Sequence, residues 1–307
     1  MRFLVVGPGA MGSLFAACLQ KAGFDVTLLD YIEERAKKIN AHGIRVEGVT
    51  GDYTEKVLTT TGDIHQPPDL VLICVKAYDT RDASLNIEPW LKPETGVVTL
   101  QNGVGNLEIL EEIFGNDRVL GGVTAEGATL LGPGEIRHAG RGETIIGPGG
   151  DSGSPAEKMV TAFNQAGFQA RSVKHVKDLI WGKLLINVGI NALTAITGLK
   201  NGRLPEMDGT RLIMEEAVKE AVAVAEAKNI NLPYPDPIGR VIEVCRATAG
   251  NIASMLQDVL KEKLTEIDFI NGAIVREGQA LGIPTPVNLT LTSLVQVIQK
   301  TYQERAV

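Results

Sequence analysis

The chain of 307 residues contains few cysteines and few histidines. Its three cysteines are widely spaced and form no C-x-x-C pair, so the sequence predicts neither a disulfide framework nor a structural zinc site. Its four histidines are scattered as well, which gives no metal-ligating constellation and no paired nucleophile. We therefore expect no metal, and the cysteine usage suits a reducing, cytoplasmic environment.

An excess of positive charge is also missing. The chain has 30 lysines and arginines against 37 aspartates and glutamates, which gives a formal net charge of −7. No basic run is present that could follow a phosphate backbone. We expect no nucleic-acid partner.

Long hydrophobic runs are scarce. The longest apolar stretch without charge lies between Lys183 and Lys200, carries two asparagines, and is shorter than the ~20 residues that a bilayer span needs. The apolar N-terminus is interrupted by glycines where the core of a signal peptide would be continuous. We therefore expect no membrane association.

What the chain does contain is a globular composition, 44% hydrophobic and 22% charged, at a length that favours two domains. In the first half, short apolar strands alternate with helical segments, which predicts a parallel sheet. The glycine-rich segment from Gly121 to Gly150 predicts antiparallel strands added to the edge of that sheet, and a last strand is expected near Phe168–Val173. The remainder shows only helical patterns.

A glycine-rich turn follows the first predicted strand, residues 2–6, and precedes a predicted helix. It is a complete G-x-G-x-x-G, and its glycines are suited to a tight turn, close approach to a pyrophosphate and close helix packing. An ordinary glycine turn is the alternative. We expect an α/β fold with a dinucleotide-binding Rossmann domain over 1–174, including added edge strands, and an all-helical substrate and catalytic domain over 175–307. The residues of the turn are Gly7, Pro8, Gly9, Ala10, Met11 and Gly12.

An acidic residue, Asp30, ends the second predicted strand, 18 residues after Gly12. This is close to the ~20 expected for the acid that accepts hydrogen bonds from the adenosine ribose. An N-cap role for the following helix is the alternative. A carboxylate here would repel a 2′-phosphate of charge about −1.5 to −2, so Asp30-Tyr31 favours NAD(H). Three basic residues on the next helix could still reach a phosphate: Arg35, Lys37 and Lys38.

A polar stripe marks the first helix of the second half, which is otherwise apolar nearly all round. Lys183, Asn187 and Asn191 are spaced i, i+4, i+8 and so share one face. Because buried polar groups need partners, the stripe indicates a lined cleft. A lysine reaching solvent beside two asparagines bonded to backbone is the alternative.

A second polar constellation follows near the C-terminus. Asn251, Ser254 and Asp258 have helical spacing, and Glu266 and Asp268 come soon after. Taken singly, either acid could be the N-terminal acid of a helix capped by Thr265. Further motifs that the chain carries are Val75-Lys76-Ala77, Gln101-Asn102-Gly103, Asn201-Gly202 and Asn271-Gly272.

With these motifs, the chain resembles the ketopantoate reductases (2-dehydropantoate 2-reductases) over essentially its whole length. The resemblance implies an active site in a cleft between the two domains, and NADP(H)-dependent reduction of 2-dehydropantoate to (R)-pantoate in pantothenate synthesis. It implies that Lys183 is the catalytic general acid, that Glu266 is the acid beside it, and that Lys76 and Asn102 lie near the nicotinamide. The residues implied to bind substrate are Asn102, Asn187, Asn191, Asn201, Asn251 and Ser254.

One departure concerns the dinucleotide. Many family members carry an arginine just past the second strand, where this chain has Asp30-Tyr31. The donor, NADH or NADPH, therefore stays open, as does the substrate, since related reductases act on other 2-keto acids. A dinucleotide-binding regulator without catalysis is a further alternative. The apolar faces of the C-terminal helices are compatible with a homodimer.

Overall fold

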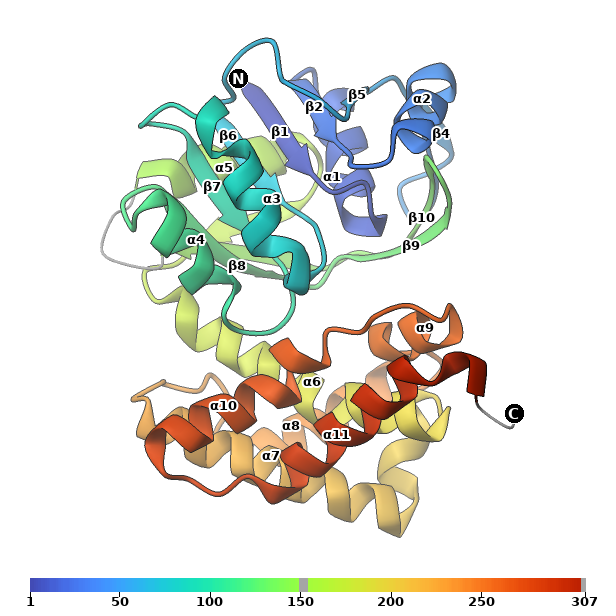
Figure 1. Ribbon diagram of the computed structural model, residues 1–307, viewed down its shortest axis with the longest axis vertical. Helices are drawn as coiled ribbons and strands as arrows, with labels where there is room; N and C mark the ends of the chain where they lie inside the picture. The colour runs from blue at the N-terminus through green and yellow to red at the C-terminus, as the bar shows by residue number, and fades with distance from the viewer. Residues whose placement is uncertain (149–153, 305–307) are drawn as a thin grey trace. The chain divides into compact units, whose positions relative to one another are not determined.

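Residues 1–148 and 154–304 are described by the structure, a computed structural model in which the chain divides into two units (Figure 1). The first unit contains Met1–Gln101 and Asn106–Val176, and the second contains Asn102–Gly105 and Lys177–Val307. The short segment Asn102–Gly105 thus belongs with the second unit although the chain on both sides of it belongs to the first. No pattern in the sequence predicts that these four residues belong to the second unit.

An eight-stranded sheet is the centre of the first unit, in the order β12-β11-β8-β7-β6-β1-β2-β5. From β5 to β8 all neighbours are parallel, whereas β11 runs antiparallel to β8 and parallel to β12. The predicted parallel sheet with added edge strands is therefore confirmed. The strands are β1 (Arg2–Val6), β2 (Asp25–Leu29), β5 (Leu58–Thr60), β6 (Leu70–Ile73), β7 (Gly96–Thr99), β8 (Val119–Thr124), β11 (Glu143–Pro148) and β12 (Gln169–Ser172).

Two of the glycine-rich strands do not extend this sheet, which corrects one expectation from the sequence. β9 (Gly127–Gly132) and β10 (Glu135–Gly140) form a separate four-stranded sheet with β3 (Ile44–Gly48) and β4 (Tyr53–Glu55). β10 pairs in parallel with β3, far away in the sequence. The alternating pattern predicts strands but does not specify such partners.

Five α-helices of the described chain accompany the sheets of the first unit. They are α1 (Ala10–Lys21), α2 (Glu33–His42), α3 (Thr80–Ile87), α4 (Asn106–Phe114) and α5 (Ser154–Gln165). Apolar residues of α1, α2 and α5 pack in a core in which Phe15 stacks on Phe163 with ring centroids 5.1 Å apart. Apolar residues recur at helical spacing in these segments. Gly23 and Gly43, both with positive φ, follow the ends of α1 and α2.

After β12 the regular elements of the described chain are all α-helices and 3₁₀ turns, as predicted for the second unit. Its first helix, α6 (Val176–Thr197), is long and apolar enough to cross a membrane by length and composition, but 67% of its most apolar window is buried, as in a core helix. The other helices are α7 (Asp208–Ala227), α8 (Pro237–Ala247), α9 (Ser254–Leu260), α10 (Asn271–Leu281) and α11 (Pro286–Lys300), with 3₁₀ turns at Asn201–Glu206, Ile267–Phe269 and Tyr302–Glu304.

Candidate active site

The glycine-rich turn between β1 and α1 has a different steric reason for each glycine. Gly7 has φ of +104°, and a Cβ there would lie 2.8 Å from the backbone nitrogen of Val75. A Cβ on Gly12 would overlap the carbonyl oxygen of Gly7. A Cβ on Gly9 would meet nothing closer than the carbonyl oxygen of Cys74 at 4.0 Å. Packing therefore requires Gly7 and Gly12, whereas the face of Gly9 is open toward a ligand.

The N-terminus of α1 is suited to a phosphate. Its N-cap residue, Gly9, makes no side-chain capping bond, and no acidic residue lies in the first turn. The N–H of Ser13 is the one that closes the first helical turn, on the carbonyl of Gly9 at 2.9 Å. The preceding amide groups and the helix dipole therefore face outward, which fits the pyrophosphate of a dinucleotide.

Asp30 lies at the end of β2 and is almost fully buried, with 4% of its surface exposed. Its Oδ1 accepts hydrogen bonds from the backbone N–H of Tyr31 at 2.7 Å and of Ile32 at 3.0 Å. Both oxygens also pair with the guanidinium of Arg35, whose Nε donates to Oδ2 at 2.6 Å. This pairing raises the pKa of Arg35. The N-cap of α2 is Ile32, so Asp30 organises the loop and not the helix end.

The ion pair changes the electrostatics expected from the sequence. Arg35 balances the charge of Asp30, so a phosphate near β2 meets a neutral pair and not an isolated carboxylate. The exposed ring of Tyr31 lies beside this pair, with the Arg35 guanidinium 5.1 Å from its centroid. Sequence patterns indicate Arg35 only as a possible phosphate ligand, and they carry no signal of its bond to Asp30.

Gln101, which the sequence marks only as part of a motif, braces the loop that carries Lys76. Its Nε2 donates to the carbonyl of Val75 at 2.7 Å and to the hydroxyl of Thr80 at 2.9 Å. Its Oε1 accepts from the hydroxyl of Thr99 at 2.8 Å. These bonds join the carboxyl ends of β6 and β7, where ligands of parallel sheets bind. The signal in the sequence is an amide side chain placed directly after a buried strand.

Asn102 is carried into the helical unit by the segment that follows Gln101. The N–H of Val104 donates to the carbonyl of Phe269 at 3.0 Å, and the side chain of Val104 packs in the helical core. Gly103 has φ of +84°, and a Cβ there would overlap the same carbonyl oxygen. Asn102 therefore lies in the same unit as Glu266, although the two are far apart in the sequence.

Lys183 and Glu266, both in the helical unit, interact electrostatically. The Lys183 side chain, on α6, keeps some accessible surface, but its ammonium group is desolvated, and burial lowers its pKa to about 8. The carboxylate of Glu266 acts in the opposite direction and raises that pKa. Glu266 is 7% exposed and precedes the 3₁₀ turn Ile267–Phe269, to which its side chain gives no capping bond. Asp268 lies in the first turn of this 3₁₀ segment, and the Thr265 hydroxyl accepts the N–H of Ile267 at 3.4 Å, so the alternative of an acid at a helix N-terminus beside Thr265 holds for this short turn.

The asparagines of the stripe on α6 are also withdrawn from solvent. Asn191 is 5% exposed, and the Nδ2 of Asn187 is buried without a hydrogen-bond partner within residues 1–148 and 154–304. Asn201 donates through Nδ2 to the hydroxyl of Thr248 at 2.9 Å, while its Oδ1 is likewise buried and unpartnered among the described residues. Burying a polar atom without a hydrogen bond costs free energy, so a ligand or a water molecule is expected to bond to these two atoms.

Asn251 and Ser254 are placed differently from what the sequence predicted. α9 begins at Ser254 after an extended Ala253, so Asn251 lies in the preceding loop and the predicted shared helical spacing is wrong for it. Asn251 is tied by backbone to Asn201, whose N–H donates to its carbonyl at 3.2 Å. Asn251 and Ser254 are both exposed.

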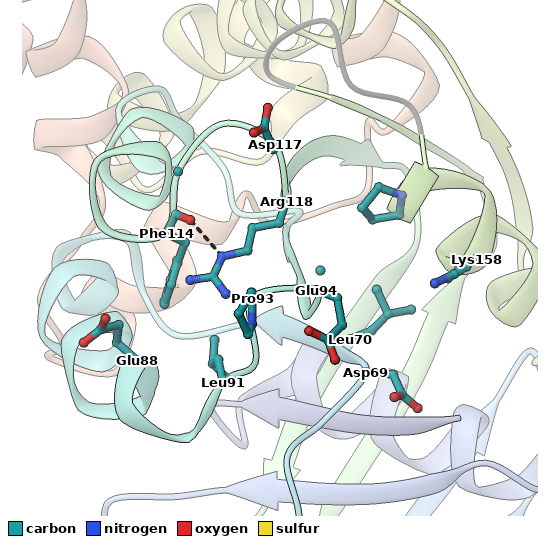
Figure 2. A pocket seen from close by; sticks show the side chains of 13 residues that line it. Asp69, Leu70, Glu88, Leu91, Pro93, Glu94, Phe114, Asp117, Arg118 and Lys158 are labelled. Carbon is teal, nitrogen blue, oxygen red and sulfur yellow. Dashed lines mark hydrogen bonds between the residues drawn. The ribbon is translucent and has the colours of Figure 1, made fainter.

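A pocket of about 590 Å³ lies elsewhere in the first unit, at the amino ends of β6 and β7 (Figure 2). Arg118 lies in it with its Nε bonded to the carbonyl of Phe114 at 2.8 Å. None of the residues singled out from the sequence line it. In the part of the chain that the structure describes, no group of three or more His, Cys, Asp and Glu side chains is placed to hold a metal ion.

Comparison with known proteins agrees with this architecture. Residues 3–151 match the family model described as ketopantoate reductase PanE/ApbA, and residues 175–299 match that of its C-terminal domain. A 2-dehydropantoate 2-reductase of Halobacterium salinarum is 36% identical over 98% of this chain and 99% of its own length.

Two solved structures are similar over nearly the whole chain. A PanE/ApbA family ketopantoate reductase from Ralstonia eutropha has a TM-score of 0.91 at 35% identity, covering 99% of this chain and 100% of its own. A D-mandelate dehydrogenase, solved with NADH and anilino(oxo)acetate, has a TM-score of 0.91 at 28% identity with the same coverage. The chain belongs to the ketopantoate reductase family.

Proposed function

We propose that this protein is a 2-dehydropantoate 2-reductase, an NAD(P)H-dependent oxidoreductase that reduces 2-dehydropantoate to (R)-pantoate for pantothenate synthesis. The observation that carries the proposal is the desolvated Lys183 with Glu266 acting on it, in a helical unit that presents unpartnered amide groups among its described residues. A dinucleotide-binding regulator would need no buried proton donor. The names of the relatives support the same activity.

The proposed chemistry needs a proton donor. A bound reduced dinucleotide supplies the hydride to the ketone carbon. Lys183 Nζ then protonates the alkoxide oxygen, and its positive charge polarises the carbonyl beforehand. A pKa of about 8 leaves the ammonium mostly protonated at neutral pH yet able to release its proton, because Glu266 offsets part of the desolvation.

Polar side chains of the helical unit that contains this pair are proposed to hold the substrate. The Nδ2 of Asn187 suits a carboxylate or hydroxyl oxygen, and the Oδ1 of Asn201 suits a hydroxyl donor, since both atoms lack a partner among the described residues. Asn102, Asn191, Asn251 and Ser254 are proposed as further contacts through the resemblance to the family. Lys76, on the loop braced by Gln101, is proposed to lie near the nicotinamide.

The proposed donor is NADH. Asp30 holds a carboxylate where the adenosine ribose is bound in this fold. Its Oδ2 accepts a hydrogen bond from the Nε of Arg35, which leaves a further lone pair for a ribose hydroxyl. Arg35 is occupied by that carboxylate and is not positioned as an independent phosphate ligand. The structural neighbour with bound NADH is consistent with this choice.

A second candidate substrate class is another 2-keto acid. The likeness to D-mandelate dehydrogenase at a TM-score of 0.91 favours it, because the same architecture then accommodates an aromatic side chain. Both candidates share the roles proposed for Lys183 and Glu266 and differ in the pocket for the substituent. The cytoplasmic location and a homodimer stay predictions.

The deciding experiment follows the absorbance of the reduced nicotinamide with 2-dehydropantoate, with NADH and NADPH compared at equal concentration. Rapid oxidation supports the proposed function, and a higher kcat/KM with NADH supports the proposed donor. If neither dinucleotide is oxidised although both bind, 2-dehydropantoate is not the substrate. Phenylglyoxylate and branched 2-keto acids then test the second candidate.

A further inference from the structure

A network of buried amides crosses the core of the helical unit. Asn271, the first residue of α10, and Asn288, in the first turn of α11, are both fully buried. The Nδ2 of Asn271 donates to the Oδ1 of Asn288 at 3.0 Å and to the carbonyl of Val188, on α6, at 3.2 Å. The network therefore connects α10 and α11 to the helix that carries Lys183.

The other side of the network reaches α7. The Nδ2 of Asn288 donates to the carbonyl of Ala217 at 2.9 Å and to the Oε2 of Glu220 at 2.7 Å. Glu220 also accepts the N–H groups of Val287 at 2.8 Å and of Asn288 at 2.9 Å, so it caps the start of α11. These bonds fix the orientation of the Asn288 amide, and that in turn directs the Nδ2 of Asn271 toward its two acceptors.

Stability alone is a poor reason for this arrangement. The amides lie among apolar side chains, and the Oδ1 of Asn271 is buried without a partner in the described part of the chain. A buried, partly satisfied amide is less favourable than a well-packed apolar side chain. What the network does provide is a directional link, which apolar packing does not.

The link joins the two elements that carry the proposed catalytic pair. Val188 follows Lys183 by five residues on α6, a rise of about 7.5 Å. Asn271 follows Glu266 by five residues, and the intervening turn is held by the N–H of Phe269, which donates to the carbonyl of Glu266 at 3.0 Å. A shift of α10 relative to α6 would therefore move Glu266 relative to Lys183.

We propose that Asn271 is a positioning residue that holds Glu266 at a fixed distance from Lys183 through its hydrogen bonds to Val188 and Asn288. The proposal deepens the proposed function, on which it rests for the role of Lys183. The charged neighbours of the network act elsewhere. Glu220 is committed to the start of α11, and Asp268 accepts a bond from the Nε2 of Gln296 at 2.7 Å. Glu266 is the charged group that acts on Lys183.

The test compares Asn271→Leu with Thr292→Val. The first replacement keeps a side chain of similar volume but removes both amide bonds. The second removes a buried bond of 2.7 Å from the Thr292 hydroxyl to the carbonyl of Asn288, without touching the link to α6. Lysine labelled with ¹³C gives the pKa of Lys183 directly by NMR titration, with its signal assigned by its absence in Lys183→Arg.

In Asn271→Leu the Lys183 titration should move to lower pH by about half a unit or more, because an extra ~1 Å of separation weakens an ion pair by that amount at an effective dielectric constant near 20. The alkaline limb of kcat/KM, which reports the pKa of the free enzyme, should move with it. Thr292→Val should lower the stability of the protein but leave both the Lys183 titration and the alkaline limb of the pH profile unchanged. An unchanged Lys183 titration in a folded Asn271→Leu protein overturns the proposal.

If Asn271→Leu does not fold, Asn271→Ser replaces it, since a serine hydroxyl is too short to reach the carbonyl of Val188. The same shift is then expected, and its absence overturns the proposal in the same way. The NMR titration needs no substrate. A protein that reduces no 2-keto acid but shows the shift contradicts the proposed function alone, and an active protein without the shift contradicts the positioning role alone.

Discussion

The backbone N–H of Val104 donates a hydrogen bond of 3.0 Å to the carbonyl of Phe269, at the end of the turn that begins after Glu266. This bond ties the Asn102–Gly105 segment to the helical unit. Gly103 permits it, because φ of +84° suits glycine and any Cβ would overlap the Phe269 carbonyl. The place of Asn102 relative to Glu266 therefore depends on one glycine.

Gly103→Ala should lower both stability and turnover. The alanine meets an unfavourable φ, which costs about 1–3 kcal/mol, and in addition displaces the turn next to Glu266. Gly115→Ala is the matched control, since Gly115 has φ of +85° and a Cβ there would have no atom within 4 Å among the described residues. Thermal unfolding and kcat measure the two effects. Equal losses in both variants would show that the contact with Phe269 has no consequence for catalysis.

The activity should fall as the pH rises through about 8. Lys183 is the proposed acid and must be protonated, and its pKa is lowered to about 8. Lys183→Met should lose about 10²–10⁴-fold in kcat and show no such limb, while dinucleotide binding is retained. A pH profile of kcat/KM for both proteins is the measurement, because kcat/KM reports the pKa of the free enzyme. Near-normal turnover in Lys183→Met would contradict the assignment.

The lowered pKa of Lys183 also affects how the stability of the fold depends on pH. Because the folded-state pKa of Lys183 lies below its ordinary value of 10.5, the unfolded chain binds the proton more tightly between pH 8 and 10.5. The contribution of Lys183 to stability therefore rises with pH through that interval, and below pH 8 its full burial penalty is present. Lys183→Met should unfold at a higher temperature than the wild type at pH 7, with the difference shrinking toward pH 10.

Gly9→Ala should separate ligand binding from folding. A methyl group at Gly9 meets no atom closer than 4.0 Å, so the protein should keep its melting temperature, but the methyl group occupies the space for the pyrophosphate. We expect at least a tenfold weaker affinity for the dinucleotide, about 1.4 kcal/mol, by fluorescence titration. Gly12→Ala, which overlaps the Gly7 carbonyl, should instead lower the melting temperature. Unchanged affinity in Gly9→Ala would place the dinucleotide elsewhere.

Asp30→Ser should shift the preference toward NADPH. Removing the carboxylate leaves the Arg35 guanidinium and the N–H groups of Tyr31 and Ile32 without their acceptor, a set of donors that suits a phosphate. The ratio of NADPH to NADH affinity should rise about tenfold or more. Asp30→Ser combined with Arg35→Ala should lose most of this gain. If the double variant keeps it, Arg35 is not the phosphate ligand.

Much of the architecture could be predicted from local patterns. The strand, glycine turn and helix at residues 2–22, the apolar rod of α6 and the absence of strands after β12 in the described residues all follow from periodicity and turn chemistry. The separate sheet formed by β3, β4, β9 and β10 could not be predicted, because strand partners distant in the sequence leave no local signal.

The sequence by itself determined which chemical groups are available: a dinucleotide turn, an acid after β2, and a lysine, asparagines and a carboxylate in the helical half. Only the tertiary structure decided how they are paired. It balanced Asp30 with Arg35, brought Asn102 to the unit of Glu266, and linked Asn271 to Val188 across the core. The physical reason is that composition and spacing act along the chain, whereas charge, burial and hydrogen bonding act through space over a few ångströms.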